Sequence, residues 1–110
     1  LAVQRDRSPN FVRLSNGDIR NAYTVKISNK QQHERHFTLE LTGLPQATFS
    51  VANAQPPLAV HADHVATFRV LVTVLGSAAP AGAKPIEFAL RDERGERAAT
   101  HESVFVGPVR

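Results

Sequence analysis

Apolar and polar residues alternate along much of this chain, with the period of two that a β-strand shows when one face lies on a core. The clearest example is segment 23–27, in which Tyr23, Val25 and Ile27 alternate with polar residues. Similar patterns predict further strands at 37–41, 48–52, 58–60, 68–75, 86–90 and 98–106.

Two of these segments say more about how the strands pack. Segment 68–75 has apolar residues at both alternating positions, so we expect a central strand that is covered on much of both faces. In segment 48–52, we expect Phe49 and Val51 to face inward. One core is expected to contain Tyr23, Val25, Ile27, Phe37, Leu39, Phe68, Val70, Val72, Phe88 and Phe105.

Turn-forming residues separate the predicted strands. Seven Pro and six Gly are spread through the 110 residues, a spacing typical of short strands joined by turns. Asn16-Gly17-Asp18 and 92–95 are predicted turns, and 78–83 is a predicted mobile loop. We therefore expect an all-β chain, an immunoglobulin-like β-sandwich of about seven antiparallel strands in a single domain over 1–110. A small closed barrel is the alternative.

Composition excludes several kinds of site. Because the chain has no Cys, it provides no disulfide, thiolate metal site, cysteine nucleophile or iron–sulfur ligand. The absence of Cys and Trp also separates it from antibody domains. It has no Met and begins at Leu1, so we expect a piece of a longer polypeptide. Segment 65–75, which Arg69 interrupts, is too short for the roughly 20-residue span of a membrane helix, so we expect this piece to be soluble.

Charge and motif content point away from nucleic-acid binding and from catalysis. Thirteen Lys and Arg against ten Asp and Glu give a net charge of +3, and the Arg residues are scattered from Arg5 to Arg110. Nucleic-acid binding requires clustered cations on one face, so we expect no nucleic-acid partner. The chain has neither a G-x-S-x-G nucleophile motif nor a glycine-rich phosphate loop, so we expect no catalytic residues.

The five histidines are the only candidate metal ligands that the sequence suggests. His33 and His36 stand in H-E-R-H, His61 and His64 stand in H-A-D-H, and His101 is alone. Neutral imidazoles are good ligands for copper and zinc. Both pairs fall in or beside predicted loops, where a spacing of three fixes no geometry. We therefore interpret them as solvated loop residues and keep His61, His64 and His101 as weak metal candidates.

Several short motifs occur in order between Arg5 and Lys30, namely Arg5-Asp6-Arg7, Gly17-Asp18-Ile19-Arg20-Asn21, Tyr23 and Asn29-Lys30. With these motifs the segment resembles the C-terminal domain of the FixG or CcoG family of membrane-bound cytochrome c oxidase accessory proteins. Gly43-Leu44-Pro45 and Phe105-Val106-Gly107-Pro108 extend the resemblance over essentially the whole chain.

This resemblance implies a bacterial inner-membrane protein, in which membrane helices and a ferredoxin-like segment with two four-iron four-sulfur clusters precede this C-terminal domain. The family is implicated in assembling the cbb(3)-type haem-copper oxidase, with reduction of cupric to cuprous copper as the activity. We expect this soluble domain to face the periplasm, as exported sandwiches commonly do. Because Cys and Met suit cuprous ion and both are missing here, we expect no cofactor and no copper relay in this domain.

We expect the motif residues to have mainly structural roles. Asn21 and Asn29 flank the strand at 23–27 and are expected to hydrogen-bond loop backbone, and Tyr23 is expected to bury its ring. The expected partner contacts are Arg5, Arg7, Arg13 and Arg20, because guanidinium groups suit carboxylate or phosphate partners. Arg20 could instead pair with Asp18.

Three functional hypotheses follow. The first is a non-catalytic interaction domain, whose partner is an oxidase subunit, an oxidase-assembly protein or the rest of its own chain. The second is a copper-binding domain that uses the histidines. The third is a periplasmic peptide- or carbohydrate-binding sandwich, for which a single Tyr and no Trp leave little for sugar stacking.

Overall fold

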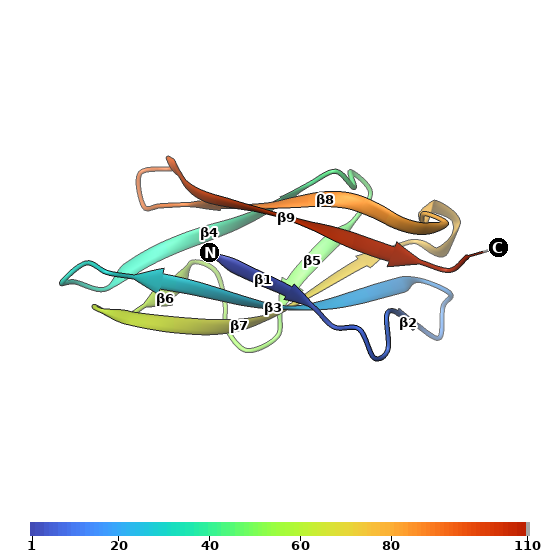
Figure 1. The fold of residues 1–110 in the computed structure, drawn as a ribbon, viewed down its shortest axis with the longest axis horizontal. Helices are drawn as coiled ribbons and strands as arrows, with labels where there is room; N and C mark the ends of the chain where they lie inside the picture. Colours follow the sequence, from blue (N-terminus) through green and yellow to red (C-terminus); the bar gives the residue numbers. More distant parts are fainter. Residues whose placement is uncertain (110) are drawn as a thin grey trace.

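In the computed structural model, which describes residues 1–109, most of the chain is in β-strands (Figure 1). The strands are β1 (Ala2–Arg5), β2 (Val12–Arg13), β3 (Ile19–Asn29), β4 (Arg35–Thr42), β5 (Thr48–Val51), β6 (Leu58–Val60), β7 (His64–Val74), β8 (Gly82–Arg91) and β9 (Arg97–Gly107). A single turn of 3-10 helix, η1 (Gly76–Ala78), joins β7 to β8. Within residues 1–109, no helix is long and apolar enough to cross a membrane.

The strands form two antiparallel sheets that pack face to face (Figure 1). The first sheet has the order β1-β3-β7-β5, with β2 also paired to β3, and the second has the order β6-β4-β8-β9. This arrangement confirms the all-β, immunoglobulin-like sandwich. It also puts β7 between β3 and β5, the central position that the sequence predicts for 68–75.

The core lies between the two sheets and follows the alternation in the sequence. On β3 every second residue from Ile19 to Asn29 is buried, and its partner strand β7 shows the same alternation from Phe68 to Val74. All ten residues that the sequence predicts for the core are buried there. Tyr23 and Phe88, from opposite sheets, meet edge to face with ring centroids 5.1 Å apart. Such a pair stabilises a core beyond the area that it buries.

Phe49 and Val51 on β5 are expected to face inward. Phe49 pairs with the buried Val72, so it faces the inner side of the first sheet as the sequence predicts. The residue nevertheless remains 36% exposed on β5, an edge strand of the first sheet. Val51, on the same strand, is partly buried against the core.

The element boundaries also differ from those that the sequence predicts. The structure adds β1 and β2, whose four and two residues are too short to show a clear alternation. The loop expected at 78–83 is shorter, because η1 includes Ala78 and β8 already begins at Gly82.

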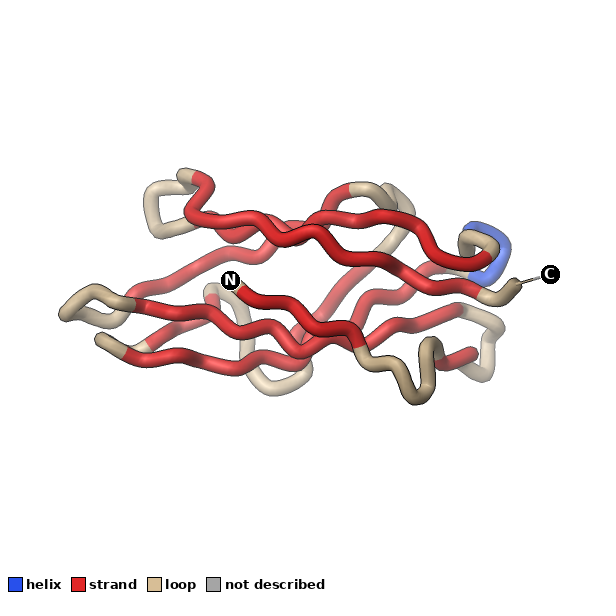
Figure 2. Tube along the Cα trace, viewed as in Figure 1, coloured by secondary structure: helices blue, strands red, loops and turns tan. Residues whose placement is uncertain are grey.

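Loops and turns gather mainly at the two ends of the long axis (Figure 2). The β3–β4, β6–β7 and β8–β9 connections lie at one end, which we call the hairpin end, and η1 and the C-terminus lie at the other. Along one long side, β1 of the first sheet lies beside β9 of the second (Figure 1). We call this open side the β1–β9 seam.

Candidate functional site

Asn21 and Tyr23 extend from β3 across the space between the sheets to β9, the edge strand of the second sheet. Asn21 Nδ2 donates to the Val106 carbonyl oxygen at 2.9 Å, and the Val106 N–H donates to Asn21 Oδ1 at 2.8 Å. The Tyr23 hydroxyl donates to the Val104 carbonyl oxygen at 2.7 Å. These side chains occupy backbone groups that would otherwise pair with another strand. Burial raises the pKa of Tyr23 above its usual range, so the phenol remains a neutral donor.

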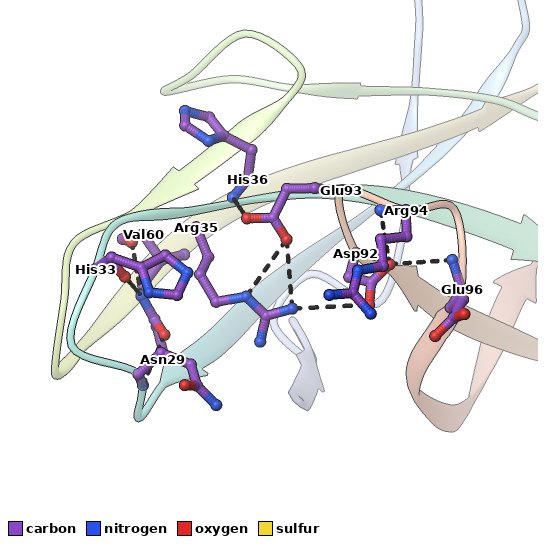
Figure 3. A network of polar contacts seen from close by, with 10 residues as sticks. Asn29, His33, Arg35, His36, Val60, Asp92, Glu93, Arg94 and Glu96 are labelled. Atoms are coloured by element: carbon purple, nitrogen blue, oxygen red, sulfur yellow. Dashed lines mark hydrogen bonds and ion pairs between the residues drawn. The ribbon is translucent and has the colours of Figure 1, made fainter.

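Asn29, at the end of β3, holds two loops of the hairpin end together (Figure 3). Its side chain is buried, and Nδ2 lies 2.9 Å from the His33 carbonyl oxygen, 3.0 Å from that of Val60 and 3.1 Å from that of His61. Its Oδ1 accepts from the Gln31 N–H at 3.0 Å. One buried amide therefore fixes the backbone of both the β3–β4 and the β6–β7 connection.

Arg35 is the centre of a charged network that joins the start of β4 to the β8–β9 connection (Figure 3). Its guanidinium lies 3.3 Å from Glu93 and 3.8 Å from Asp92, and it also stacks over the Phe37 ring. Glu93 accepts from its own backbone N–H and from the His36 N–H, and these bonds together with Arg35 lower the pKa of Glu93 below its ordinary value. These contacts hold the start of β4 against the β8–β9 connection.

Four of the five histidines lie at the hairpin end. Glu34 lies 3.4 Å from His36 Nε2 and 3.1 Å from His61 Nδ1, and the rings of His61 and His64 have centroids 6.0 Å apart. The remaining weak metal candidate, His101, is on β9, two strands away from β4 in the second sheet. The structure therefore does not bring His61, His64 and His101 together. Within residues 1–109, no group of three or more His, Asp or Glu side chains is placed to hold a metal ion.

The four arginines expected at a partner surface all belong to the N-terminal part of the chain, but they differ in their contacts. Arg5 donates to the backbone carbonyl oxygens of Asp6 and Asn10, so it has a structural role as well. Arg7 and Arg13 are exposed, and Arg20 is half-buried on β3. The alternative pairing of Arg20 with Asp18 is not among the ion pairs of residues 1–109, and Asp18 accepts from Asn16 instead.

The sequence reasoning missed the ion pair between Arg69 and Asp6. Arg69 donates to both carboxylate oxygens of Asp6, at 3.0 and 2.8 Å, and to the Thr24 hydroxyl at 3.1 Å. The pair lowers the pKa of Asp6 and ties the segment after β1 to the outer face of the first sheet. The signal for this pair in the sequence is Arg69 itself, the one charged residue in segment 65–75.

A polar hollow opens at the β1–β9 seam. It is lined by Val3, Gln4, Arg5, Arg7, Glu102, Ser103 and Val104. A second hollow adjoins it through Val3 and Gln4 and is also lined by Ala2, Thr24, Lys26 and His101. Two of the arginines expected to contact a partner therefore line one concave surface.

A comparison with protein families identifies the fold. The family model described as "IG-like fold at C-terminal of FixG, putative oxidoreductase" matches residues 1–108. The chain belongs to this family. Membership in the FixG C-terminal family confirms the resemblance that the sequence motifs suggested.

Individual relatives agree with this assignment. The chain is 36% identical over 80 residues to the nitrogen fixation protein FixG of Rhizobium meliloti, covering 67% of this chain and 15% of that protein. It is 36% identical over 97 residues to protein RdxA of Cereibacter sphaeroides, covering 86% of this chain and 19% of that protein. It thus matches less than one fifth of each relative's length.

A solved structure shows the same fold. The FixG-related protein from Vibrio parahaemolyticus superposes with a TM-score of 0.79 at 24% identity, covering 96% of this chain and 92% of that one. At this identity, the likeness supports the fold alone.

Proposed function

We propose that this chain is a non-catalytic interaction domain at the C-terminus of a membrane-bound iron–sulfur protein that assists assembly of a cbb(3)-type cytochrome c oxidase. Its membership in the FixG C-terminal family supports this parent protein. Its partner is a protein surface, which belongs to an oxidase subunit, to an assembly protein or to the rest of its own chain.

The observation that carries the proposal is the use made of the buried polar side chains. The side chains of Asn21, Tyr23 and Asn29 form hydrogen bonds with backbone atoms of neighbouring strands and loops. In residues 1–109, no buried side-chain nitrogen or oxygen is left without a partner. A polar group held ready for a substrate would often be left unsatisfied in an empty site. The interior therefore supports a structural role, and the groups available for contact lie on the surface.

The redox chemistry of the parent protein belongs, in this proposal, outside the domain. Cluster ligation requires thiolates, and this chain has no Cys. Cuprous ion prefers Cys and Met ligands, which are also missing here. We therefore assign the two four-iron four-sulfur clusters, the cupric reductase activity and the membrane helices to the preceding part of an inner-membrane protein, with this domain on the periplasmic side.

Deletion of the domain from the full-length protein tests this division of labour. We expect the truncated protein to keep its iron–sulfur absorption and its cupric reductase rate, because a separately folded domain without thiolates contributes no cluster ligand. Oxidase activity in the same cells, or accumulation of the protein itself, should fall. If the truncated protein accumulates normally but loses its clusters, the domain is part of the redox centre and the proposal is wrong.

A further inference from the structure

The edge of β9 is occupied along only half of its length. β9 has eleven residues and ends the second sheet. Asn21 and Tyr23 bind the backbone of Val106 and Val104 on the side away from β8. Because antiparallel pairing alternates along a strand, the backbone groups of Thr100 and Glu102 face the same free side. Of these, the Glu102 carbonyl oxygen meets His101 Nδ1 at 2.8 Å.

Of the side chains that face the sheet interior beside this free edge, Ala99 packs against the core, whereas His101 and Ser103 are polar. Ser103 pairs with Ile86 and His101 pairs with Phe88, and both partners are buried core residues. Ser103 and His101 therefore point toward the space between the sheets, yet both remain partly exposed at the seam. Inward-facing positions of a sandwich strand usually hold apolar side chains that pack in the core. Polar side chains at these positions suit a surface that a polar segment covers.

The seam is also more basic than the rest of the molecule. Arg5 and Arg7 line the first hollow, Lys26 lines the second, and Glu102 is the only acidic residue in either lining. The ion pairs of residues 1–109 include neither Arg7 nor Lys26. Residues 1–30 contain six Lys and Arg against two Asp, a net charge of +4, whereas the remaining residues contain seven against eight, a net charge of −1.

We propose that the β1–β9 seam binds an extended acidic segment of the partner protein. The segment adds to the free half of β9, residues 98–102, as a further strand, and it directs alternate carboxylates toward Arg7 and Lys26. Backbone bonds to an edge strand give affinity, and the charges of alternate side chains give selectivity. This inference rests on the interaction role proposed above and specifies the chemistry of the partner.

Titration of the purified chain with a synthetic peptide tests the inference. The probe is a short peptide in which Glu alternates with Val, and the matched control has Lys in place of Glu. By heteronuclear NMR, we expect the acidic peptide to shift the amide resonances of 98–102 and of β1, and the basic peptide to leave them unchanged. Binding of both peptides, or shifts confined to other strands, would overturn the inference.

Two substitutions separate strand addition from general attraction. Arg7→Glu should weaken binding by about tenfold or more, because it reverses a charge that contacts the segment. Thr100→Pro should abolish binding, because it removes an N–H from the free edge, where proline is compatible with folding. Arg94→Glu, in the exposed β8–β9 turn, is the control and should bind as the parent chain does. NMR dispersion shows whether each variant is folded.

The remaining outcomes are equally decisive. If inorganic polyphosphate shifts the same resonances as strongly as the peptide, the seam is only a basic patch and strand addition is wrong. If the peptide does not bind while deletion of the domain still impairs oxidase assembly, the interaction role stands and this inference fails. If the peptide binds while deletion leaves assembly intact, the seam is real and the proposed function is wrong.

Discussion

Asn21, Tyr23 and Asn29 occupy alternate inward positions of β3 that an apolar sandwich would fill with aliphatic residues. Each bonds to backbone from another part of the fold, and Asn21 and Tyr23 reach partners 85 and 81 residues away in sequence. Their effect on stability is asymmetric, because a bond that forms adds little net free energy while a buried group left without a partner costs more. Asn21 and Tyr23 therefore close the 104–106 part of the outer edge of β9, and Asn29 organises the hairpin end.

Tyr23 offers a direct measure of this residue-scale effect. We expect Tyr23→Ala to lower the free energy of unfolding by about 3 to 5 kcal/mol, as for other buried aromatic residues. Tyr23→Phe keeps the ring but leaves the Val104 carbonyl oxygen without its donor, so we expect a loss of about 1 to 3 kcal/mol. Urea melts followed by circular dichroism measure both. A loss below about 1 kcal/mol for Tyr23→Ala would contradict the buried position.

Asn29 should matter for the hairpin end in particular. Asn29→Ala removes the amide that bonds the backbone at His33, Val60 and His61, so we expect a loss of about 2 to 3 kcal/mol together with faster amide exchange around His33 and His61. The exposed neighbour Lys30 provides the control, since Lys30→Ala should change stability by less than about 0.5 kcal/mol. Equal effects of the two substitutions would mean that the amide does not organise these loops.

At the scale of elements, the alternation of apolar and polar residues predicts the long strands because it is a local signal. Residues such as Val25 and Val70 face the core whichever strand lies beside their own. The signal fails at edges. β2 has two residues, which cannot show a period, and Phe49 faces inward but stays 36% exposed on the edge strand β5. The bonds of Asn21 and Tyr23 to β9 depend on which strands face each other, and that information is absent from local sequence.

The Arg69–Asp6 pair joins β7 to the segment after β1 and should make stability depend on pH. Arg69 lowers the pKa of Asp6 from its ordinary value of 3.8, so below that value the unfolded chain binds more protons than the folded one. The contribution is therefore present at neutral pH and is lost as the pH falls through the folded pKa. Because both side chains are 40% exposed, we expect only about 0.5 to 1 kcal/mol.

Asp6→Asn separates this contribution from the other carboxylates. Its deficit relative to the parent chain should be largest at neutral pH and should shrink as the pH falls below 3.8, the ordinary pKa of the carboxyl, as measured by urea melts from pH 7 to pH 3. Glu96→Gln, at an exposed turn residue, is the control and should show no deficit. A deficit that stays constant down to pH 3 would show that Asp6 acts through packing and not through its charge.

For the molecule as a whole, the sandwich separates its candidate chemistry. The hairpin end holds four histidines, with Glu34 beside His36 and His61, while the β1–β9 seam holds Arg5, Arg7 and His101. The sequence could predict the residue types of both groups, but not their separation, because the two sets come from strands that are interleaved along the chain. This separation is what divides the metal hypothesis from the interaction hypothesis.

Calorimetric titration with cupric ion at neutral pH tests that division. Within residues 1–109, His61 and His64 have no third side chain placed to complete a metal site with them, and His101 lies on another strand. We therefore expect no cupric site with a dissociation constant below about micromolar. The double variant His61→Ala/His64→Ala should then give the same isotherm as the parent chain, and His101→Ala serves as the matched single-histidine control on the seam. Submicromolar binding that the double variant abolishes would mean that the exposed side chains around Glu34 rearrange to enclose the ion. In that case the domain would handle copper itself, and the assignment of all metal chemistry to the preceding part of the protein would be wrong.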